Sequence, residues 1–246
     1  MCIVISPAER GRLLPLGATA SLPASWSCEE TAGRDAGAPS KGVSSRADFK
    51  RVAHMTLPSL ILASGSPRRA ELLRQAGVEF KIVPSEVLEI HHQDLTAREV
   101  SQINAYRKAR SVAKKFPDAL VLGADTLVYL ETALFGKPPT LEQAYLMLEQ
   151  LQGRTHHVVT AICLLHLRGR RQKVFSVDTA VTFRDLDAPR IRKYLTQVNP
   201  LDKAGAYAIQ EHGDWLVANI AGSYTNVVGL PVESVKAELS AWNASG

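Results

Sequence analysis

From residue 60 onward, short apolar runs alternate with segments in which apolar residues recur every three or four positions. The short runs predict strands, and the periodic segments predict helices. The predicted strands cover residues 60–63, 80–83, 119–123, 133–135, 156–167, 173–183 and 215–220, and the predicted helices cover 66–76, 96–115, 140–151, 188–197 and 232–242. Because both element types alternate along one stretch, the pattern predicts a mixed α/β domain of about 190 residues.

The first 54 residues differ from the rest in composition, because 25 of them are Gly, Pro, Ser or Ala. Their apolar positions follow neither the helical nor the strand period, so residues 1–54 are expected to be disordered. No basic region precedes the short apolar start, and five acidic residues argue against a transit peptide. We therefore expect a disordered or wrongly annotated extension at 1–54 and a folded domain at 55–246. The domain should fold on its own from Met55, which stands just before the first predicted strand.

Composition and charge narrow the classes of function. No stretch approaches the roughly 18 consecutive apolar residues of a membrane helix, so no membrane partner is expected. The net charge is +5, but the basic residues form no sustained run and aromatic residues make up only 6% of the chain, which argues against a nucleic-acid-binding domain. The three cysteines have no metal-ligand spacing and indicate a reducing compartment. His156 and His157 are neighbours on a predicted strand, so their side chains should point to opposite faces and not share a metal.

Residues 64–69, with the sequence Ser-Gly-Ser-Pro-Arg-Arg, lie between the first predicted strand and the first predicted helix. Ser66 suits the N-cap of that helix and Pro67 its first helical position. Backbone N–H groups at a helix start favour an anion. Arg68 and Arg69 would add planar donors that match phosphate oxygens. The segment therefore predicts a phosphate-binding loop, and the alternative is an ordinary capped helix with two solvated arginines.

Two further segments place charged residues beside predicted strands. Asp125, in Gly-Ala-Asp-Thr, follows a buried strand, and a carboxylate at such a strand end faces the crevice where α/β proteins bind ligands. It would bind a divalent metal or act as general base on water, unless it only caps a turn. Lys137, in Gly-Lys-Pro-Pro, would contact a phosphate, unless it is simply solvated. The Gly-rich segments 204–210 and 222–231 suit a backbone that approaches a ligand or turns tightly.

Taken in order, these segments resemble the motifs of the Maf family of nucleoside-triphosphate pyrophosphatases. The matching segments are Leu-Ala-Ser-Gly-Ser-Pro-Arg-Arg at 62–69, Gly-Ala-Asp-Thr at 123–126, Gly-Lys-Pro at 136–138, Gly-Arg-Thr-His at 153–156 with Thr160, Ala-Gly-Ala-Tyr-Ala-Ile-Gln at 204–210, and 223–231. They span about residues 60 to 240, and the first 54 residues have no counterpart in the resemblance.

The resemblance implies a cytoplasmic enzyme that uses a divalent metal, Mg²⁺ or Mn²⁺, to cleave the α–β bond of a nucleoside triphosphate into monophosphate and pyrophosphate. It also implies an elongated mixed sheet with flanking helices and a central cleft, like that of inosine-triphosphate pyrophosphatases. The implied catalytic residues are Asp125, Lys137 and Glu89, with Asp125 and Glu89 as metal ligands. The implied substrate-binding residues are Ser64, Arg68, Arg69, Lys108 and Gln210.

Segments 63–66, 123–126 and 206–210 resemble the branch of the family that acts on dTTP and UTP. A branch that acts on 7-methyl-GTP stays an alternative, since Glu211 and His212 stand where the pyrimidine branch often has Gly. A non-catalytic nucleotide-binding regulator of cell division, acting through a protein partner, is a second alternative, against which the presence of both Asp125 and Lys137 argues. The expected partner is thus the nucleotide, with no nucleic acid and no membrane, and a homodimer is left open.

Overall fold

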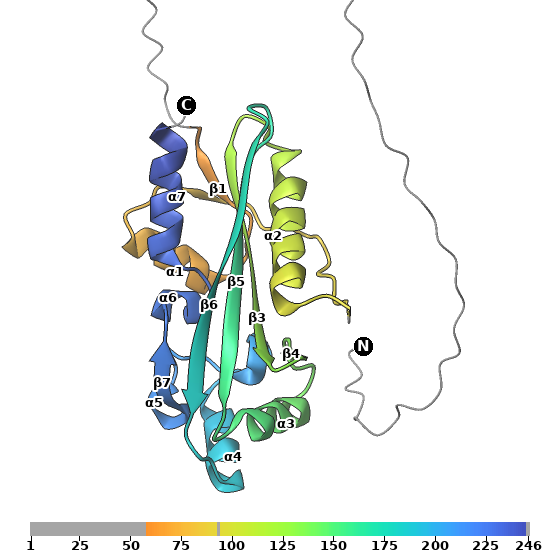
Figure 1. Cartoon of the computed structure of the whole chain (residues 1–246), viewed down its shortest axis with the longest axis vertical. Coiled ribbons are helices and arrows are strands. Elements are labelled where there is room, and N and C mark those ends of the chain that lie inside the picture. The colour runs from red at the N-terminus through yellow and green to blue at the C-terminus, as the bar shows by residue number, and fades with distance from the viewer. Residues whose placement is uncertain (1–57, 93, 245–246) are drawn as a thin grey trace, which may run out of the picture. The chain divides into compact units, whose positions relative to one another are not determined.

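Figure 1 shows the computed structural model, which describes residues 58–92 and 94–244. The predicted extension at 1–54 and the alternative start at Met55 lie outside the described residues. Within the described ranges, no helix is both long and apolar enough to cross a membrane.

In the part of the chain that the structure describes, the fold is built on one mixed sheet of seven strands. The strands are β1 (Leu60–Leu62), β2 (Lys81–Ile82), β3 (Leu120–Leu130), β4 (Ala133–Phe135), β5 (Thr155–His166), β6 (Arg171–Phe183) and β7 (Val217–Ala221). Their order is β2-β1-β3-β5-β6-β7, and β4 also pairs with β3. β1 runs parallel to β2 and β3, whereas the remaining pairs are antiparallel. The expected mixed α/β class is therefore confirmed, and the long β5 and β6 make the sheet elongated (Figure 1).

Helices cover both faces of this sheet (Figure 1). On one face, Ala105 and Ala109 of α2 (Ala97–Ala113) pack against Val121 of β3. On the other face, Leu73 of α1 (Pro67–Gln75) packs with Leu122 of β3, and α7 (Val232–Ala244) joins the same cluster. Val121 and Leu122 are neighbours on one strand, so their side chains necessarily point to opposite faces. The helices are α1 (Pro67–Gln75), α2 (Ala97–Ala113), α3 (Leu141–Leu151), α4 (Ala188–Gln197), the 3₁₀ turn η1 (Ala204–Ala206), α5 (Gly213–Leu216), α6 (Tyr224–Val228) and α7 (Val232–Ala244).

Several elements differ from the expectations. The strand predicted for 119–123 extends to Leu130, because β5 pairs with it as far as Tyr129. The polar Asp125 and Thr126 interrupt the apolar run, so the sequence pattern placed the strand end too early. The strand predicted for 215–220 begins only at Val217, since the residues before it form the short helix α5. The short helices α5 and α6 and the turn η1 had no predicted counterpart.

One edge of β3 has a gap. β1 pairs with residues 120–122 of β3, and β4 pairs with residues 128–130. Within the described part of the chain, no strand pairs with residues 123–127 on that edge. The chain leaves β1 directly into segment 64–69, at the level where this gap begins. The gap therefore brings Ser64 and Asp125 to the same edge of the sheet.

Candidate active site

Asp125 lies in the middle of β3, and only 2% of the residue is exposed. Its Oδ1 accepts a hydrogen bond from Lys108 Nζ at 2.6 Å, and its Oδ2 accepts one from Asn104 Nδ2 at 3.3 Å. Asn104 and Lys108 are four residues apart, so they project from one side of α2. A capping box between Thr96 and Glu99 starts that helix. The helix thus presents an amide and an ammonium to one buried carboxylate, which rules out the alternative that Asp125 only caps a turn.

Glu89 shares the same ammonium, because Lys108 Nζ also donates to Glu89 Oε1 at 2.6 Å. Glu89 belongs to the loop between β2 and α2, and Asn104 fastens this loop to the helix. Asn104 Oδ1 accepts from the backbone N–H of Ile90 at 2.8 Å, and its Nδ2 lies 3.1 Å from the Ile90 carbonyl oxygen. Asn104 was missed in the sequence, since a single Asn inside a predicted helix forms no motif. Its spacing of four residues from Lys108 is the signal that could have found it.

The two carboxylates differ in basicity because they differ in burial. Burial raises the pKa of Asp125 above its ordinary value, while the Lys108 ammonium opposes this rise and the Glu89 charge adds to it. Burial also acts to raise the pKa of Glu89, but Lys108 and then Lys137 outweigh it, so the pKa of Glu89 lies below its ordinary value. Asp125 is therefore the better proton acceptor of the pair.

Arg69 is held by three neutral oxygen atoms. Its Nε donates to the Gly229 carbonyl at 2.9 Å, its Nη1 donates to Ser64 Oγ at 3.0 Å, and its Nη2 donates to Thr126 Oγ1 at 2.9 Å. Burial lowers the pKa of Arg69, whereas the charges of both carboxylates raise it, so the guanidinium lies within electrostatic reach of the carboxylate pair. The alternative of a solvated surface arginine is thus wrong for Arg69.

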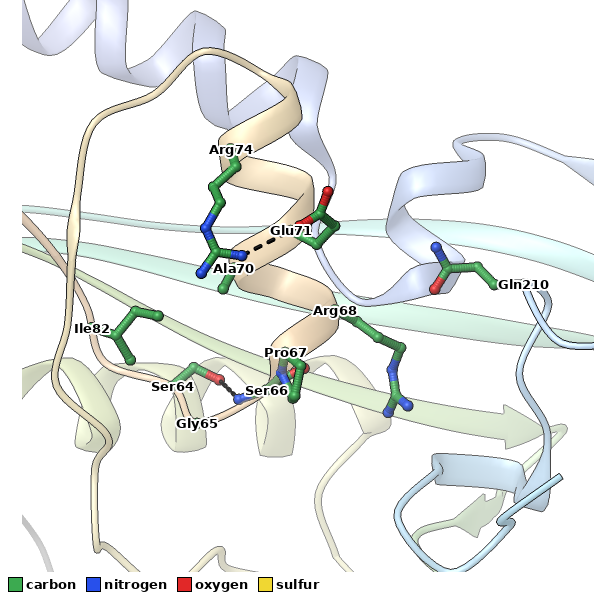
Figure 2. Close-up of a pocket in the computed structure, with 10 residues that line it drawn as sticks. All are labelled: Ser64, Gly65, Ser66, Pro67, Arg68, Ala70, Glu71, Arg74, Ile82 and Gln210. Carbon is green, nitrogen blue, oxygen red and sulfur yellow. Dashed lines mark hydrogen bonds and ion pairs between the residues drawn. The ribbon is translucent and has the colours of Figure 1, made fainter.

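Arg68 and Gln210 line a pocket of about 490 Å³ beside the start of α1, and Figure 2 shows their side chains. Ser64 also lines this pocket, but the two carboxylates do not. Arg68 Nη1 donates to Asp202 Oδ2 at 3.1 Å, and Arg68 Nη2 donates to the Asp202 carbonyl at 3.3 Å. Ser66 caps α1 as predicted, since its side chain accepts from the backbone N–H of Arg69. The pocket therefore reaches the Arg69 guanidinium through Ser64, and neither carboxylate lines it.

Lys137 is exposed in the loop that follows β4. Its charge helps to lower the pKa of Glu89, which places it near that carboxylate. The loop is tied down by a hydrogen bond from the Gly205 N–H to the Gly136 carbonyl at 3.1 Å. The structure thus gathers one group of predicted residues around the gap in β3, and it places Arg68 and Gln210 on the adjoining pocket. The group around the gap comprises Ser64, Arg69, Glu89, Lys108, Asp125 and Lys137.

The carboxylate pair suits a divalent metal that completes its ligands from a substrate. Among the described residues, no group of three or more His, Cys, Asp or Glu side chains could hold a metal ion. Mg²⁺, however, is commonly bound by one or two carboxylates together with substrate phosphates and water. Glu89 and Asp125 converge on one cationic atom, Lys108 Nζ, so their oxygens face a common point. The histidine pair contributes nothing there, because His156 contacts Tyr207 and His157 contacts Asp178.

Comparison with known proteins relates this chain to one family. The family model described as Maf-like protein matches residues 59–242. Proteins named dTTP/UTP pyrophosphatase are similar over most of their own length. The one from Akkermansia muciniphila is 45% identical over 179 residues, which cover 73% of this chain and 94% of that protein. The one from Moorella thermoacetica is 46% identical over 180 residues, which cover 73% and 93%.

A further relative with the same name, from a Geobacillus species, is 42% identical over 183 residues, which cover 74% of this chain and 97% of that protein. Among solved structures, protein VC0702 from Vibrio cholerae aligns with 58% of this chain and 72% of its own, at 10% identity and a TM-score of 0.30. We draw no conclusion from a similarity that low. These relatives share more than 40% of their residues with this chain across nearly their whole length. Together with the family match, they show that this chain belongs to the Maf family.

Proposed function

We propose that this protein hydrolyses nucleoside triphosphates, with dTTP and UTP preferred, at the α–β bond to give the monophosphate and pyrophosphate. The observation that carries the proposal is the buried Asp125 carboxylate, paired through Lys108 with Glu89 and lying within electrostatic reach of the Arg69 guanidinium. A base and several fixed cations at one place are what the attack of water on a phosphorus atom requires. The names of the relatives supply the substrate class.

In the proposed reaction, Asp125 accepts a proton from the attacking water. Its raised pKa brings its basicity closer to that of a base working near neutral pH. Arg69, Arg68 and Lys137 bind phosphate oxygens and stabilise the negative charge that develops on them. Ser64 Oγ accepts from Arg69 and from the Ser66 N–H, so its own hydroxyl hydrogen stays free to donate to a phosphate.

Glu89 and Asp125 would hold the divalent metal, Mg²⁺ or Mn²⁺. When bound, that metal neutralises phosphate charge and lowers the pKa of a coordinated water molecule. Lys108 lies between the two carboxylates, and its positive charge favours the ionised form of each, the form in which a carboxylate binds a metal. Because nucleoside triphosphates are intracellular metabolites, we place the enzyme in the cytoplasm.

The pyrimidine preference has to accommodate Glu211 and His212, where the dTTP/UTP branch often has Gly. Glu211 Oε1 lies 3.4 Å from the Nζ of the buried Lys203. His212 adopts a left-handed backbone conformation with a φ of 54°, and its ring packs at a tilt against Trp215. Both side chains thus have local partners of their own, so their presence does not require a different substrate.

The decisive experiment measures pyrophosphate release from UTP, dTTP, ATP, GTP and 7-methyl-GTP with Mg²⁺ or Mn²⁺. UTP and dTTP should have a kcat/KM at least about tenfold above the others, a difference of about 1.4 kcal/mol in transition-state binding. Removal of divalent ions by a chelator should abolish turnover, and added Mg²⁺ or Mn²⁺ should restore it. A preference for 7-methyl-GTP would overturn the substrate assignment. Nucleotide binding without turnover of any of the five would favour the non-catalytic regulator.

A further inference from the structure

A chain of side-chain hydroxyl groups runs from Arg69 into the interior of the protein. Arg69 Nη2 donates to Thr126 Oγ1 at 2.9 Å, and Thr126 Oγ1 lies 3.0 Å from Thr160 Oγ1. Thr160 Oγ1 in turn donates to the Asn226 carbonyl at 3.1 Å. Thr160 and Asn226 are completely buried. The chain therefore joins α1, β3, β5 and α6 through residues that lie behind the predicted site.

The groups at the two ends of this series of hydroxyls fix the direction of the hydrogen bonds along it. A guanidinium can only donate hydrogen bonds, so Thr126 Oγ1 must accept from Arg69. A carbonyl oxygen can only accept, so Thr160 must spend its single hydroxyl hydrogen on Asn226. Between the two hydroxyls, Thr126 is then the donor and Thr160 the acceptor. The arrangement keeps the lone pairs of Thr126 turned toward Arg69 and its hydrogen turned away.

The far end of the chain is anchored. Asn226 Nδ2 donates to the Val158 carbonyl at 2.9 Å and to Thr179 Oγ1 at 3.0 Å. At the near end, each guanidinium nitrogen of Arg69 donates one hydrogen bond. Nη2 donates to Thr126 Oγ1, Nε to the Gly229 carbonyl and Nη1 to Ser64 Oγ. A guanidinium has five N–H groups, so one N–H on each terminal nitrogen stays available for a ligand. Neutral acceptors orient the guanidinium without neutralising its charge.

We propose that Thr126 and Thr160 are positioning residues, which hold the Arg69 guanidinium in the orientation that binds the triphosphate. The inference rests on the proposed function, since it concerns how Arg69 meets the phosphates. Thr160 is linked to Arg69 through Thr126, and Thr126 contacts the guanidinium directly. Without Thr160 as acceptor, the Thr126 hydroxyl is free to rotate and to present its hydrogen to the guanidinium, which removes one of the three acceptors that orient Arg69.

The first test compares three variants of β5 with UTP as substrate. Thr160→Val removes the hydroxyl at nearly the same shape and should lower kcat/KM by about tenfold, the loss typical of one buried hydrogen bond. Thr160→Ser keeps the hydroxyl and should stay within about twofold of the wild type. Thr155→Val is the matched control, because Thr155 forms a similar hydroxyl pair with Thr182 at 2.8 Å but is exposed and has no contact with Arg69. Equal losses in the Val and Ser variants at position 160 would overturn the proposal.

The second test asks whether the effect passes through Arg69. In an Arg69→Ala background, Thr160→Val should cause no further loss of kcat/KM, because the group it positions is gone. A hydroxyl with a purely structural role would cause the same loss in both backgrounds, and that result would also overturn the proposal. If Thr160→Val does not fold, Thr126→Val enters the same cycle, since Thr126 is only half-buried.

The third test separates this inference from the proposed function. The non-hydrolysable analogue α,β-methylene-UTP is titrated into the wild type, Thr160→Val, Arg69→Ala and the double variant by calorimetry. If the wild type binds the analogue but does not hydrolyse UTP, the proposed function is contradicted. The Kd values of the four proteins then still show whether Thr160 acts through Arg69. We expect an about tenfold weaker Kd for Thr160→Val in the wild-type background and no change in the Arg69→Ala background. A wild type that does not bind the analogue, or a folded Thr160→Val variant with wild-type affinity, refutes the positioning role.

Discussion

Lys108 Nζ lies 2.6 Å from Asp125 Oδ1, although the two residues are 17 positions apart and belong to different elements. The side chain of Asp125 is only 3% exposed, and burial by itself favours the neutral form of a carboxyl group. The ammonium from α2 offsets part of that cost. The pair therefore favours the ionised form of a nearly inaccessible carboxylate at the edge of the sheet where the phosphates are proposed to bind, against the larger opposing effect of burial.

The first prediction concerns Asp125→Asn. The amide has nearly the same shape, so the variant should fold normally and still bind nucleotide through Arg68, Arg69 and Lys137. It lacks the charge and the basicity of the carboxylate, so kcat should fall by at least about 100-fold. Pyrophosphate release and a thermal melt measure the two properties. Wild-type turnover by the folded variant would remove Asp125 as the catalytic carboxylate and shift that role to Glu89.

The second prediction compares the two arginines at the start of α1. Alanine at either position should lower kcat/KM by on the order of 100-fold, or about 2.7 kcal/mol. The loss should be larger at Arg69, because Arg68 is already paired with Asp202, whereas the hydrogen-bond partners that the described residues provide for Arg69 are all neutral. Arg168→Ala is the control for loss of charge, since Arg168 is an exposed arginine that pairs with Asp118 and does not line the pocket. Steady-state kinetics of the three variants would contradict the assignment if Arg69→Ala behaved like Arg168→Ala.

The third prediction concerns Gly123, where α2 packs directly on β3. A Cβ at this position would overlap the Ala105 carbonyl oxygen and would lie 2.8 Å from the backbone nitrogen of Ala109. Gly123→Ala should therefore push α2 outward, lower the free energy of unfolding by about 1–3 kcal/mol or more, and displace Lys108 from its carboxylates. Gly136→Ala is the control for stability, because no atom lies within 4 Å of its added Cβ. Urea unfolding of both variants tests this, and equal stabilities would show that α2 tolerates the methyl group.

The fourth prediction concerns stability at low pH. His156 is fully buried with its Nε2 2.9 Å from Tyr207 Oη, and burial, with a smaller effect of His157, lowers its pKa from 6.5 to about 4. Between these two values the unfolded chain binds a proton that the folded chain does not, so stability falls as the pH falls through this window. The expected loss from this residue is about 3 kcal/mol once the pH reaches the lower value.

The variant His156→Gln tests that expectation, because glutamine does not titrate in this range. Its free energy of unfolding should decrease less than that of the wild type between pH 7 and pH 4, by roughly the same 3 kcal/mol. Both proteins are unfolded in urea at each pH, and each is compared with itself at pH 7. Parallel pH profiles would mean that another group causes the acid sensitivity.

The local sequence was sufficient to predict those elements and motifs whose residues are contiguous in the chain. The helix expected at 66–76 is observed at Pro67–Gln75, because Ser66 and Pro67 specify its start within a few residues. The long strands β5 and β6 were predicted for the same reason, since each is a continuous β-rich run. The motif segments also indicated the family, because each is a short string of residues that can be read without the fold.

Contacts between distant residues were decided only by the tertiary structure. β3 extends past Asp125 because β5 pairs with it, although its own polar residues ended the predicted strand early. The role of Asn104 depends on the packing of α2 against β3, and the role of Thr160 depends on the position of α6 beside β5. The hydroxyl chain joins Arg69 to Thr126 across 57 positions and Thr160 to Asn226 across 66. Sequence periodicity records which face of an element is apolar, but the partner of each buried polar group depends on strand register and helix packing, which a local pattern does not specify.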